Sequence, residues 1–98
     1  MKEVHLQSQY KKTNEVILKK LGDSHILIPI QQSNPEVAPK IFAVNKMGVL
    51  IWRLIDGYRT LKEIRDIILE TYTAKEEMVE KDLVRFIKKL ESIKAIKL

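Results

Sequence analysis

The side chains that could bind a metal ion are few in this chain and lie far apart. His5 and His25 are the only histidines, and there is no cysteine. Neither histidine stands in an HxxxH spacing or beside a carboxylate cluster, whereas zinc sites combine several such ligands at short spacings. We therefore expect both histidines to be ordinary surface residues, and we expect no metal site and no cofactor.

Nucleophilic catalysis also lacks its usual sequence patterns. No serine stands in a GxSxG turn, and the absence of a thiol excludes a cysteine nucleophile or an iron–sulfur cluster. The 3 glycines, Gly22, Gly48 and Gly57, are too dispersed to form a phosphate-binding loop. We predict that the protein is not an enzyme.

Carboxylates do gather at the start of a predicted helix that runs from about Glu76 to Ile93. They are Glu76, Glu77, Glu80 and Asp82. With the helix before it, this helix resembles a helix-turn-helix, and a flanking sheet would make it winged. The carboxylates would then face DNA from the recognition helix and repel its phosphates. We expect no nucleic-acid partner, and a winged-helix transcriptional regulator stays the alternative function.

Composition limits the class of protein and partner. The chain has 98 residues, enough for one domain, and 45% of them are hydrophobic. Its net charge of +5 suits an acidic partner, although nucleic acid and an acidic polypeptide both fit that sign. No apolar run approaches the roughly 18–20 residues of a membrane span, and Met1–Lys12 has no signal-peptide centre. We expect a cytoplasmic protein that does not bind membranes.

The first half of the chain is typical of strands. Glu15–Leu21 and Ser24–Ile30 flank Gly22-Asp23, a pair that favours a tight hairpin turn. A polar, proline-containing loop follows over Gln31–Pro39, and then a third short strand over Lys40–Val44. Pro29 lacks an N–H group, so the second strand should be at an edge or end there.

The second half is typical of three helices. Asn45 caps the first, Lys46–Asp56, and Gly57 supplies a left-handed residue to stop it. Thr60 and Glu63 match a capping box for the second, and the third spans about Glu76 to Ile93. The sequence therefore predicts an α+β, winged helix-turn-helix-like domain, with a three-stranded antiparallel sheet followed by three helices. We expect residues 1–13 to be a flexible N-terminal lead and residues 14–98 to be the domain.

A short sheet offers an edge to which a peptide can add as a further strand. The strand Lys40–Val44 is the candidate edge, and the third helix places Leu83, Phe86 and Leu90 beside the cations Arg85 and Lys89. A groove between this strand and this helix could hold the apolar side chains of an acidic peptide. Each of these apolar residues could equally be part of the core.

The segment Asn45–Ile64 resembles the signature of the PqqD-like family, the RiPP recognition elements. Its pattern is N-x-M-G-x-x-I-W-x-L-I-D-G-x-R-T-x-x-E-I, and it is most specific at Trp52, Asp56-Gly57 and Arg59-Thr60. Farther along, the spacing from Val79 through Asp82, Leu83 and Phe86 to Leu90 is also similar to the family pattern. These positions cap helices or anchor the core, and Arg59 could pair with Asp56 across the turn, so they indicate the fold more than the site.

The resemblance implies a peptide chaperone without catalytic activity. Such a domain binds the leader segment of a ribosomally made precursor peptide and presents it to a modifying enzyme, often a radical SAM protein. The leader would add to the third strand beside the third helix. The implied peptide-binding residues are Lys40, Ile41, Phe42, Ala43, Val44, Asp82, Leu83, Arg85, Phe86 and Lys89.

The chain departs from the family pattern near its end. Where the family has a glycine, this chain has Ser92-Ile93-Lys94-Ala95, so we expect the third helix to run longer than in its relatives. Ala95–Leu98 would either form a last short strand or fray. The sequence leaves open whether the protein acts alone, as a homodimer or as a piece of a larger enzyme.

Overall fold

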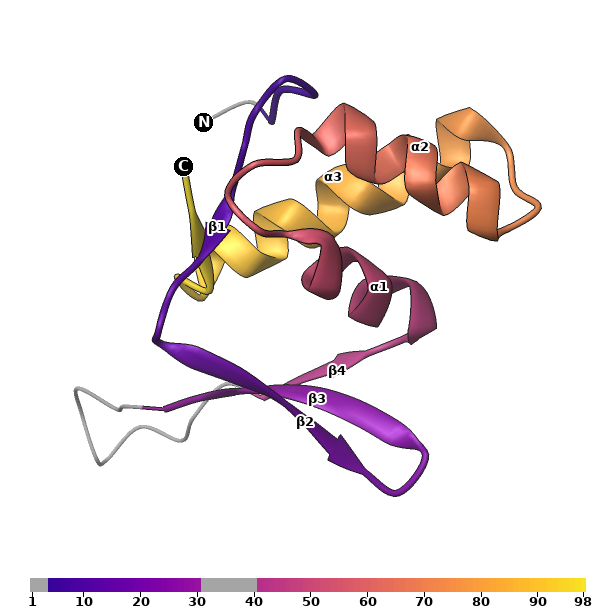
Figure 1. Cartoon of the computed structure of the whole chain (residues 1–98). Coiled ribbons are helices and arrows are strands. Elements are labelled where there is room, and N and C mark those ends of the chain that lie inside the picture. The colour runs from indigo at the N-terminus through magenta and orange to yellow at the C-terminus, as the bar shows by residue number, and fades with distance from the viewer. Residues whose placement is uncertain (1–3, 31–40) are drawn as a thin grey trace.

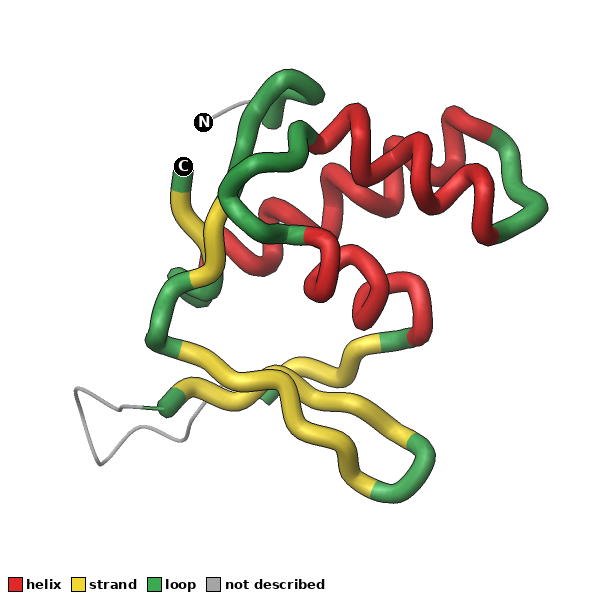
Figure 2. Tube along the Cα trace, in the orientation of Figure 1, coloured by secondary structure: helices red, strands yellow, loops and turns green. Residues whose placement is uncertain are grey.

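The computed structural model describes residues 4–30 and 41–98. In chain order the elements are β1 (Lys11–Lys12), β2 (Val16–Leu21), β3 (Ser24–Pro29), β4 (Phe42–Val44), α1 (Lys46–Leu54), α2 (Leu61–Thr71), α3 (Glu76–Ser92) and β5 (Ile96–Lys97). The strands β2, β3 and β4 form an antiparallel sheet in that order, and β1 pairs with β5. All three helices lie on one side of the larger sheet (Figures 1 and 2). The predicted α+β architecture is confirmed.

The sheet presents one face to the helices and the other to solvent. Val16, Leu27 and Val44 point inward and are buried, whereas Ile17 and Leu21 point outward and are exposed. Gly22 takes a φ of 59°, the left-handed conformation that the β2–β3 turn requires and glycine adopts without steric cost. Pro29 is the last residue of β3, which matches the expected strand end. Described helices include none that is both long and apolar enough to cross a membrane.

Two side chains cap the first two helices as the sequence predicted. The Asn45 side-chain oxygen accepts a hydrogen bond from the Gly48 N–H at 2.8 Å. Thr60 and Glu63 form the capping box: the Thr60 hydroxyl accepts from the Glu63 N–H, and the Glu63 carboxylate accepts from the Thr60 N–H. Each bond satisfies an N–H group that the first turn of a helix leaves without a backbone partner.

The turn between α1 and α2 is organised by Asp56. Its Oδ1 accepts hydrogen bonds from the N–H groups of Tyr58 and Arg59, both at 2.9 Å, and its Oδ2 pairs with the Arg59 guanidinium at 2.8 Å. The N–H donors of Arg59 and Tyr58, together with the guanidinium charge, lower the pKa of the Asp56 carboxyl. The predicted Asp56–Arg59 pair is therefore present.

The end of α1 differs from the sequence prediction. The helix ends at Leu54 rather than Asp56, because Ile55 already has extended backbone angles. Gly57 does adopt a left-handed φ of 86°, but it lies two residues beyond the cap, inside the turn that Asp56 holds. The glycine therefore shapes the connection to α2 and does not itself stop α1.

Within the expected N-terminal lead, residues 4–12 pack against the helices. Tyr10 is only 3% exposed, and the Ser8 and Tyr10 carbonyls accept hydrogen bonds from the N–H groups of Leu61 and Gly57. Burial, with the nearby Glu91 carboxylate, raises the pKa of the Tyr10 hydroxyl. Backbone hydrogen bonds and the buried Tyr10 side chain hold this segment in place. Neither produces a periodic pattern of apolar residues, which is the signal from which helices and strands are predicted.

The end of α3 lies within one residue of the predicted end at about Ile93. α3 ends at Ser92, and Lys94 adopts a φ of 58°, the conformation that a glycine usually supplies after a helix. The Ala95 N–H donates to the Leu90 carbonyl at 2.9 Å and the Lys94 N–H donates to the Glu91 carbonyl at 3.0 Å, the two bonds of a Schellman motif. The helix therefore ends in the geometry of a glycine-terminated helix, with a lysine in the glycine's place, and leads directly into β5.

A buried arginine joins α2 to α3. The Arg65 guanidinium contacts the carboxylates of Glu80, Glu76 and Asp66. Its hydrogen bond to Glu80, and then that to Asp66, raise the pKa of Arg65. This network fixes the two helices against each other near the start of α3, and it uses two of the carboxylates that crowd that start.

Candidate functional site: a pocket beside the β4 edge

A pocket opens where β4 meets α1 and α3. Its lining comes from all three elements and comprises Ala43, Val44, Asn45, Met47, Gly48, Ile51, Asp82, Arg85, Phe86 and Lys89. It encloses about 230 Å³. Pockets that bury a drug-sized ligand hold roughly 300–1,000 Å³, so this one suits a side chain or two better than a cofactor.

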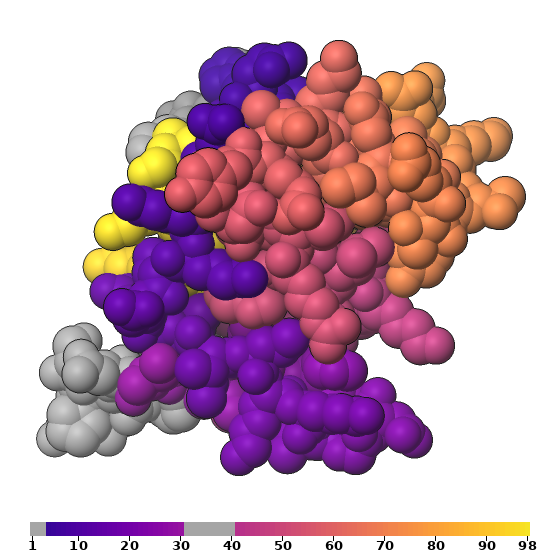
Figure 3. Space-filling view, in the orientation of Figure 1, coloured from indigo at the N-terminus to yellow at the C-terminus, as the bar shows by residue number. Residues whose placement is uncertain are grey.

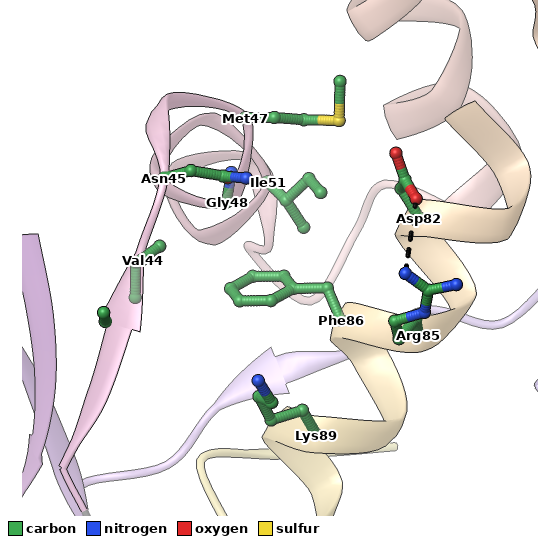
Figure 4. A pocket seen from close by; sticks show the side chains of 10 residues that line it. Val44, Asn45, Met47, Gly48, Ile51, Asp82, Arg85, Phe86 and Lys89 are labelled. Atoms are coloured by element: carbon green, nitrogen blue, oxygen red, sulfur yellow. Dashed lines mark hydrogen bonds and ion pairs between the residues drawn. The ribbon is translucent and has the colours of Figure 1, made fainter. Parts of the chain in front are cut away.

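The floor of the pocket is apolar, and it forms where α1 lies close to both β4 and α3. Phe86 projects from α3 toward the first turn of α1, below Met47 and beside Val44 and Ile51 (Figure 4). A Cβ atom at Gly48 would lie 2.6 Å from Val44 Cγ1 and 3.3 Å from Phe86 Cζ. Only a residue without a side chain fits at position 48, and its absence of bulk leaves the space that Phe86 and the pocket occupy.

The rim of the pocket is charged on the α3 side. Arg85 lies 3.9 Å from Asp82, one turn earlier on the helix, and both side chains are largely exposed. The ammonium of Lys89 lies 5.3 Å from the centre of the Phe42 ring, within range of a cation–π interaction. The exposed, loose Arg85–Asp82 pair costs little to open, so Arg85 and Lys89 can turn to an acidic ligand.

One edge of β4 borders the pocket and carries no neighbouring strand among the described residues. β4 is the last strand of the sheet, paired on its other side with β3 through Leu27↔Phe42, Ile26↔Ala43 and His25↔Val44. Its outer backbone N–H and C=O groups can therefore accept a further strand. Because strand residues alternate in direction, such a strand would point every second side chain toward the helices and the pocket.

The structure brings together most of the residues that the sequence singled out. Ala43, Val44, Asp82, Arg85, Phe86 and Lys89 all line the pocket. Phe42 lies on β4 and packs partly against the core, where it contacts Lys89. Ile41 directly precedes β4 and is 54% exposed, and Lys40 lies outside the described residues.

Leu83 is the predicted site residue that the structure places elsewhere. It is 0% exposed, inside the core, and does not line the pocket. On a helix, position 83 faces away from a surface that positions 82, 85, 86 and 89 share, because these lie three or four residues apart on one face. We leave Leu83 out of the candidate site.

Sequence reasoning missed the contribution of α1. Asn45, Met47, Gly48 and Ile51 line the pocket, yet the sequence assigned this helix to capping and core packing alone. The one available signal was Gly48, since a glycine inside an apolar helix often marks a close approach of another element. Among the described residues, no three histidines, acidic residues or cysteines are grouped so that they could hold a metal ion.

Comparison with known proteins gives a family and a shared fold. The family model described as coenzyme PQQ synthesis protein D (PqqD) matches residues 25–96. The solved structure of TbiB1 in complex with the TbiA(beta) leader peptide is similar to this chain, with a TM-score of 0.68 and 24% sequence identity. The match covers 89% of this chain and 94% of TbiB1, and at this identity it establishes a common fold. The curated proteins gave no match.

Proposed function

Since the chain belongs to the PqqD family, we propose that it binds the leader segment of a ribosomally made precursor peptide, as a strand added to the free edge of β4. The proposed binding residues are Ile41, Phe42, Ala43, Val44, Asp82, Arg85, Phe86 and Lys89, with Met47 and Gly48 of α1 in addition. Lys40 stays a prediction from the sequence. In support of this proposal, TbiB1, which shares the fold, is known in complex with a leader peptide.

The observation that carries the proposal is the position of the pocket directly beside an unpaired strand edge. The edge supplies backbone hydrogen bonds, which hold an extended peptide whatever its sequence. The pocket then selects among peptides: Met47, Ile51 and Phe86 favour an apolar side chain, and Arg85 and Lys89 favour a nearby carboxylate. We therefore expect the leader to combine an apolar anchor with acidic residues.

Membership of the family supports the rest of the proposed role. We propose that the domain has no catalytic activity and works in the cytoplasm, where it holds the leader while a modifying enzyme, of the radical SAM class, acts on the rest of the peptide. The described residues fit a binding role, because every polar group that defines the pocket is a charged rim residue or a helix cap.

The winged-helix alternative has less support from the geometry. Asp82 lies on the exposed face of α3 that DNA would have to approach, and Glu77 is exposed at the start of the same helix. Glu76 and Glu80 are engaged by Arg65, which offsets part of the acidic charge, but the exposed cations Arg85, Lys88 and Lys89 lie later on the helix than the turns that would meet DNA. We therefore do not propose nucleic acid as a partner.

The proposal can be tested with synthetic peptides that correspond to the leader halves of short reading frames next to the gene. In a titration of the ¹⁵N-labelled chain, a true leader should shift the amide resonances of Ile41–Val44 and of α3 around Phe86. A peptide that binds and shifts other residues, or a set of leaders none of which binds, would overturn the proposed site.

A matched pair of charge reversals sharpens this test. Arg85 lines the pocket, whereas Lys88 lies on the same helix, is exposed and does not line it. Arg85→Glu should weaken the binding of an acidic leader about tenfold, which corresponds to about 1.4 kcal/mol. Lys88→Glu changes the net charge equally and should leave the affinity within about twofold. If both variants lose affinity equally, general charge attraction and not the pocket is responsible.

A further inference from the structure

The outer face of the sheet is apolar, although nothing among the described residues covers it. Ile17 is 47% exposed, and its cross-strand partner Ile28 is half-buried on the same face. In the next row Lys19 lies opposite Ile26, which lies opposite Ala43. β3 is thus apolar on both faces, a pattern that is typical of strands inside a larger sheet or assembly.

The sheet also has a second free edge, along β2. β2 pairs with β3 on one side, and no described strand pairs with its other side. The hairpin of β2 and β3 projects away from the helices (Figures 1 and 3), and the strand order β2-β3-β4 places the β2 edge opposite the β4 edge. The β2 edge exposes Ile17 and Leu21 beside Lys19 and Lys20, and its unpaired backbone groups are a template for association unless something blocks or covers them.

The charges of Lys19 in β2 and of Glu15, in the bend directly before the strand, favour a second copy of this chain as the partner, and they favour one register. When two β2 strands pair antiparallel about a two-fold axis at Ile17, Glu15 of each copy lies opposite Lys19 of the other. Ile17 then meets its own counterpart, and Val16 lies opposite Leu18. Moving the axis to Lys19 would place the two Lys19 ammonium groups opposite each other, and like charges in directly opposed positions are destabilising. A two-fold axis at Leu18 would place no residue of opposite charge across from either Glu15 or Lys19.

We propose that the β2 edge is a self-association surface, at which two copies of the chain pair antiparallel about Ile17 and form one continuous sheet. The contact is isologous, so it closes at the dimer and leaves no β2 edge exposed. It is also independent of leader binding, because the β4 edge and the pocket stay open at the two ends of the joined sheet.

The expected dimer is weak. The contact consists of a single strand pair with its flanking side chains, well below the roughly 800 Å² per partner that stable interfaces bury. Association should therefore depend on concentration and should be measured by analytical ultracentrifugation of the full chain from about 10 µM to about 1 mM.

Charge reversal at the paired positions gives the decisive test. Glu15→Lys and Lys19→Glu should each weaken dimerisation about tenfold, because each turns two attractive cross-strand pairs into repulsive ones. The double variant Glu15→Lys/Lys19→Glu should restore the dimer to within about threefold of the parent. Glu15 and Lys19 are exposed, so the variants should keep the parent's melting temperature, which circular dichroism can check.

Lys20→Glu is the matched control. It makes the same charge change on the same strand, but its side chain points to the other face, where the proposed register brings no Glu15. It should leave dimerisation near the parent value. A parent chain that stays monomeric over the whole range, a charge swap that fails to restore association, or oligomers that grow past the dimer would each overturn the proposal. The leader titration would be unaffected by any of these results.

Discussion

The segment that runs from Asn45 to Glu63 and the pocket beside β4 are neighbours, but they use polar side chains in opposite ways. In the segment, Asn45, Asp56 and Thr60 bind backbone N–H groups of their own chain at 2.8–3.2 Å. In the pocket, Arg85 reaches only Asp82, at 3.9 Å, and Lys89 lies over an aromatic ring. The first region determines the fold, and the second keeps its charges available to a ligand.

This difference explains why a family signature can identify the fold and say little about the ligand. Hydrogen bonds to the backbone require particular residue types at particular spacings, so they leave a recognisable pattern. A pocket rim that pairs with a peptide requires only side chains of suitable charge and length. The residue types at the rim can therefore vary with the peptide. Variants in the two regions should therefore separate stability from affinity.

The largest expected effect on stability is that of replacing Leu83, the core residue that the sequence assigned to the site. Leu83→Ala removes a side chain that is 0% exposed and should lower the free energy of unfolding by about 2–5 kcal/mol, through lost burial and a remaining cavity. Urea denaturation measures this change. At a temperature where the variant is folded, its leader affinity should stay within about twofold of the parent. A loss of affinity without a loss of stability would return Leu83 to the binding site.

Gly48→Ala should affect both regions at once, because Gly48 lies in α1 and also lines the pocket. The added Cβ would meet Val44 Cγ1 at 2.6 Å, so overpacking should lower the free energy of unfolding by about 1–3 kcal/mol. This loss is expected although an alanine normally stabilises the inside of a helix relative to glycine. The pocket should narrow and leader affinity should fall. Thermal denaturation and a peptide titration measure the two effects.

The double variant Val44→Ala/Gly48→Ala tests the cause. Removing the Val44 methyl groups makes room for the new Cβ. The loss of stability that Gly48→Ala causes should therefore be smaller in the Val44→Ala background. If the two costs simply add, the contact between positions 44 and 48 is not what excludes a side chain at position 48.

The sequence was sufficient for several features that depend on local bonding. The Gly22 turn, the Asn45 cap, the Thr60–Glu63 capping box and the Asp56–Arg59 pair each need only neighbours within three residues. Local rules misplaced the end of α1, where Gly57 was given too much weight, and they did not reveal the left-handed Lys94 after α3. Lys94 is in the left-handed conformation because β5 must pair with β1, a contact between distant segments.

The candidate site was predictable only in part for the same reason. Charged and aromatic residues on α3 were recognisable from helical spacing, but spacing alone did not separate Leu83, which faces the core, from Phe86, which faces the pocket. The contribution of Met47 and Ile51 depends on the angle between α1 and α3, which no local pattern specifies. The packing of residues 4–12 likewise depends on backbone bonds to residues about fifty positions away.

Lys94→Gly should stabilise the protein slightly without changing leader affinity. A left-handed residue with a side chain costs roughly 1–2 kcal/mol, whereas the extra freedom of glycine in the unfolded chain costs roughly 0.5–1 kcal/mol. The expected gain in the free energy of unfolding is therefore about 0.5–1 kcal/mol, measured by urea denaturation. Lys94→Ala is the control: it removes the same charge, keeps the unfavourable φ of 58° and should bring no gain.

The smallest effect should come from Asp56→Asn and should depend on pH. Asparagine keeps the Oδ1 acceptor for the Tyr58 and Arg59 N–H groups and loses only the exposed pair with Arg59, so the loss of stability at neutral pH should be slight. The folded state lowers the pKa of Asp56 below 3.8, so its carboxylate stabilises the fold above that pH and ceases to do so as the pH falls through the folded value. The difference between parent and variant should therefore be constant from about pH 5 upward and vanish in acid. Thermal denaturation from pH 2 to pH 7 measures it, with Asp23→Asn in the β2–β3 turn as a control for the loss of one negative charge. A difference that persists unchanged at pH 2 would mean that the asparagine distorts the turn itself, and the role of Asp56 would then be one of shape and not of charge.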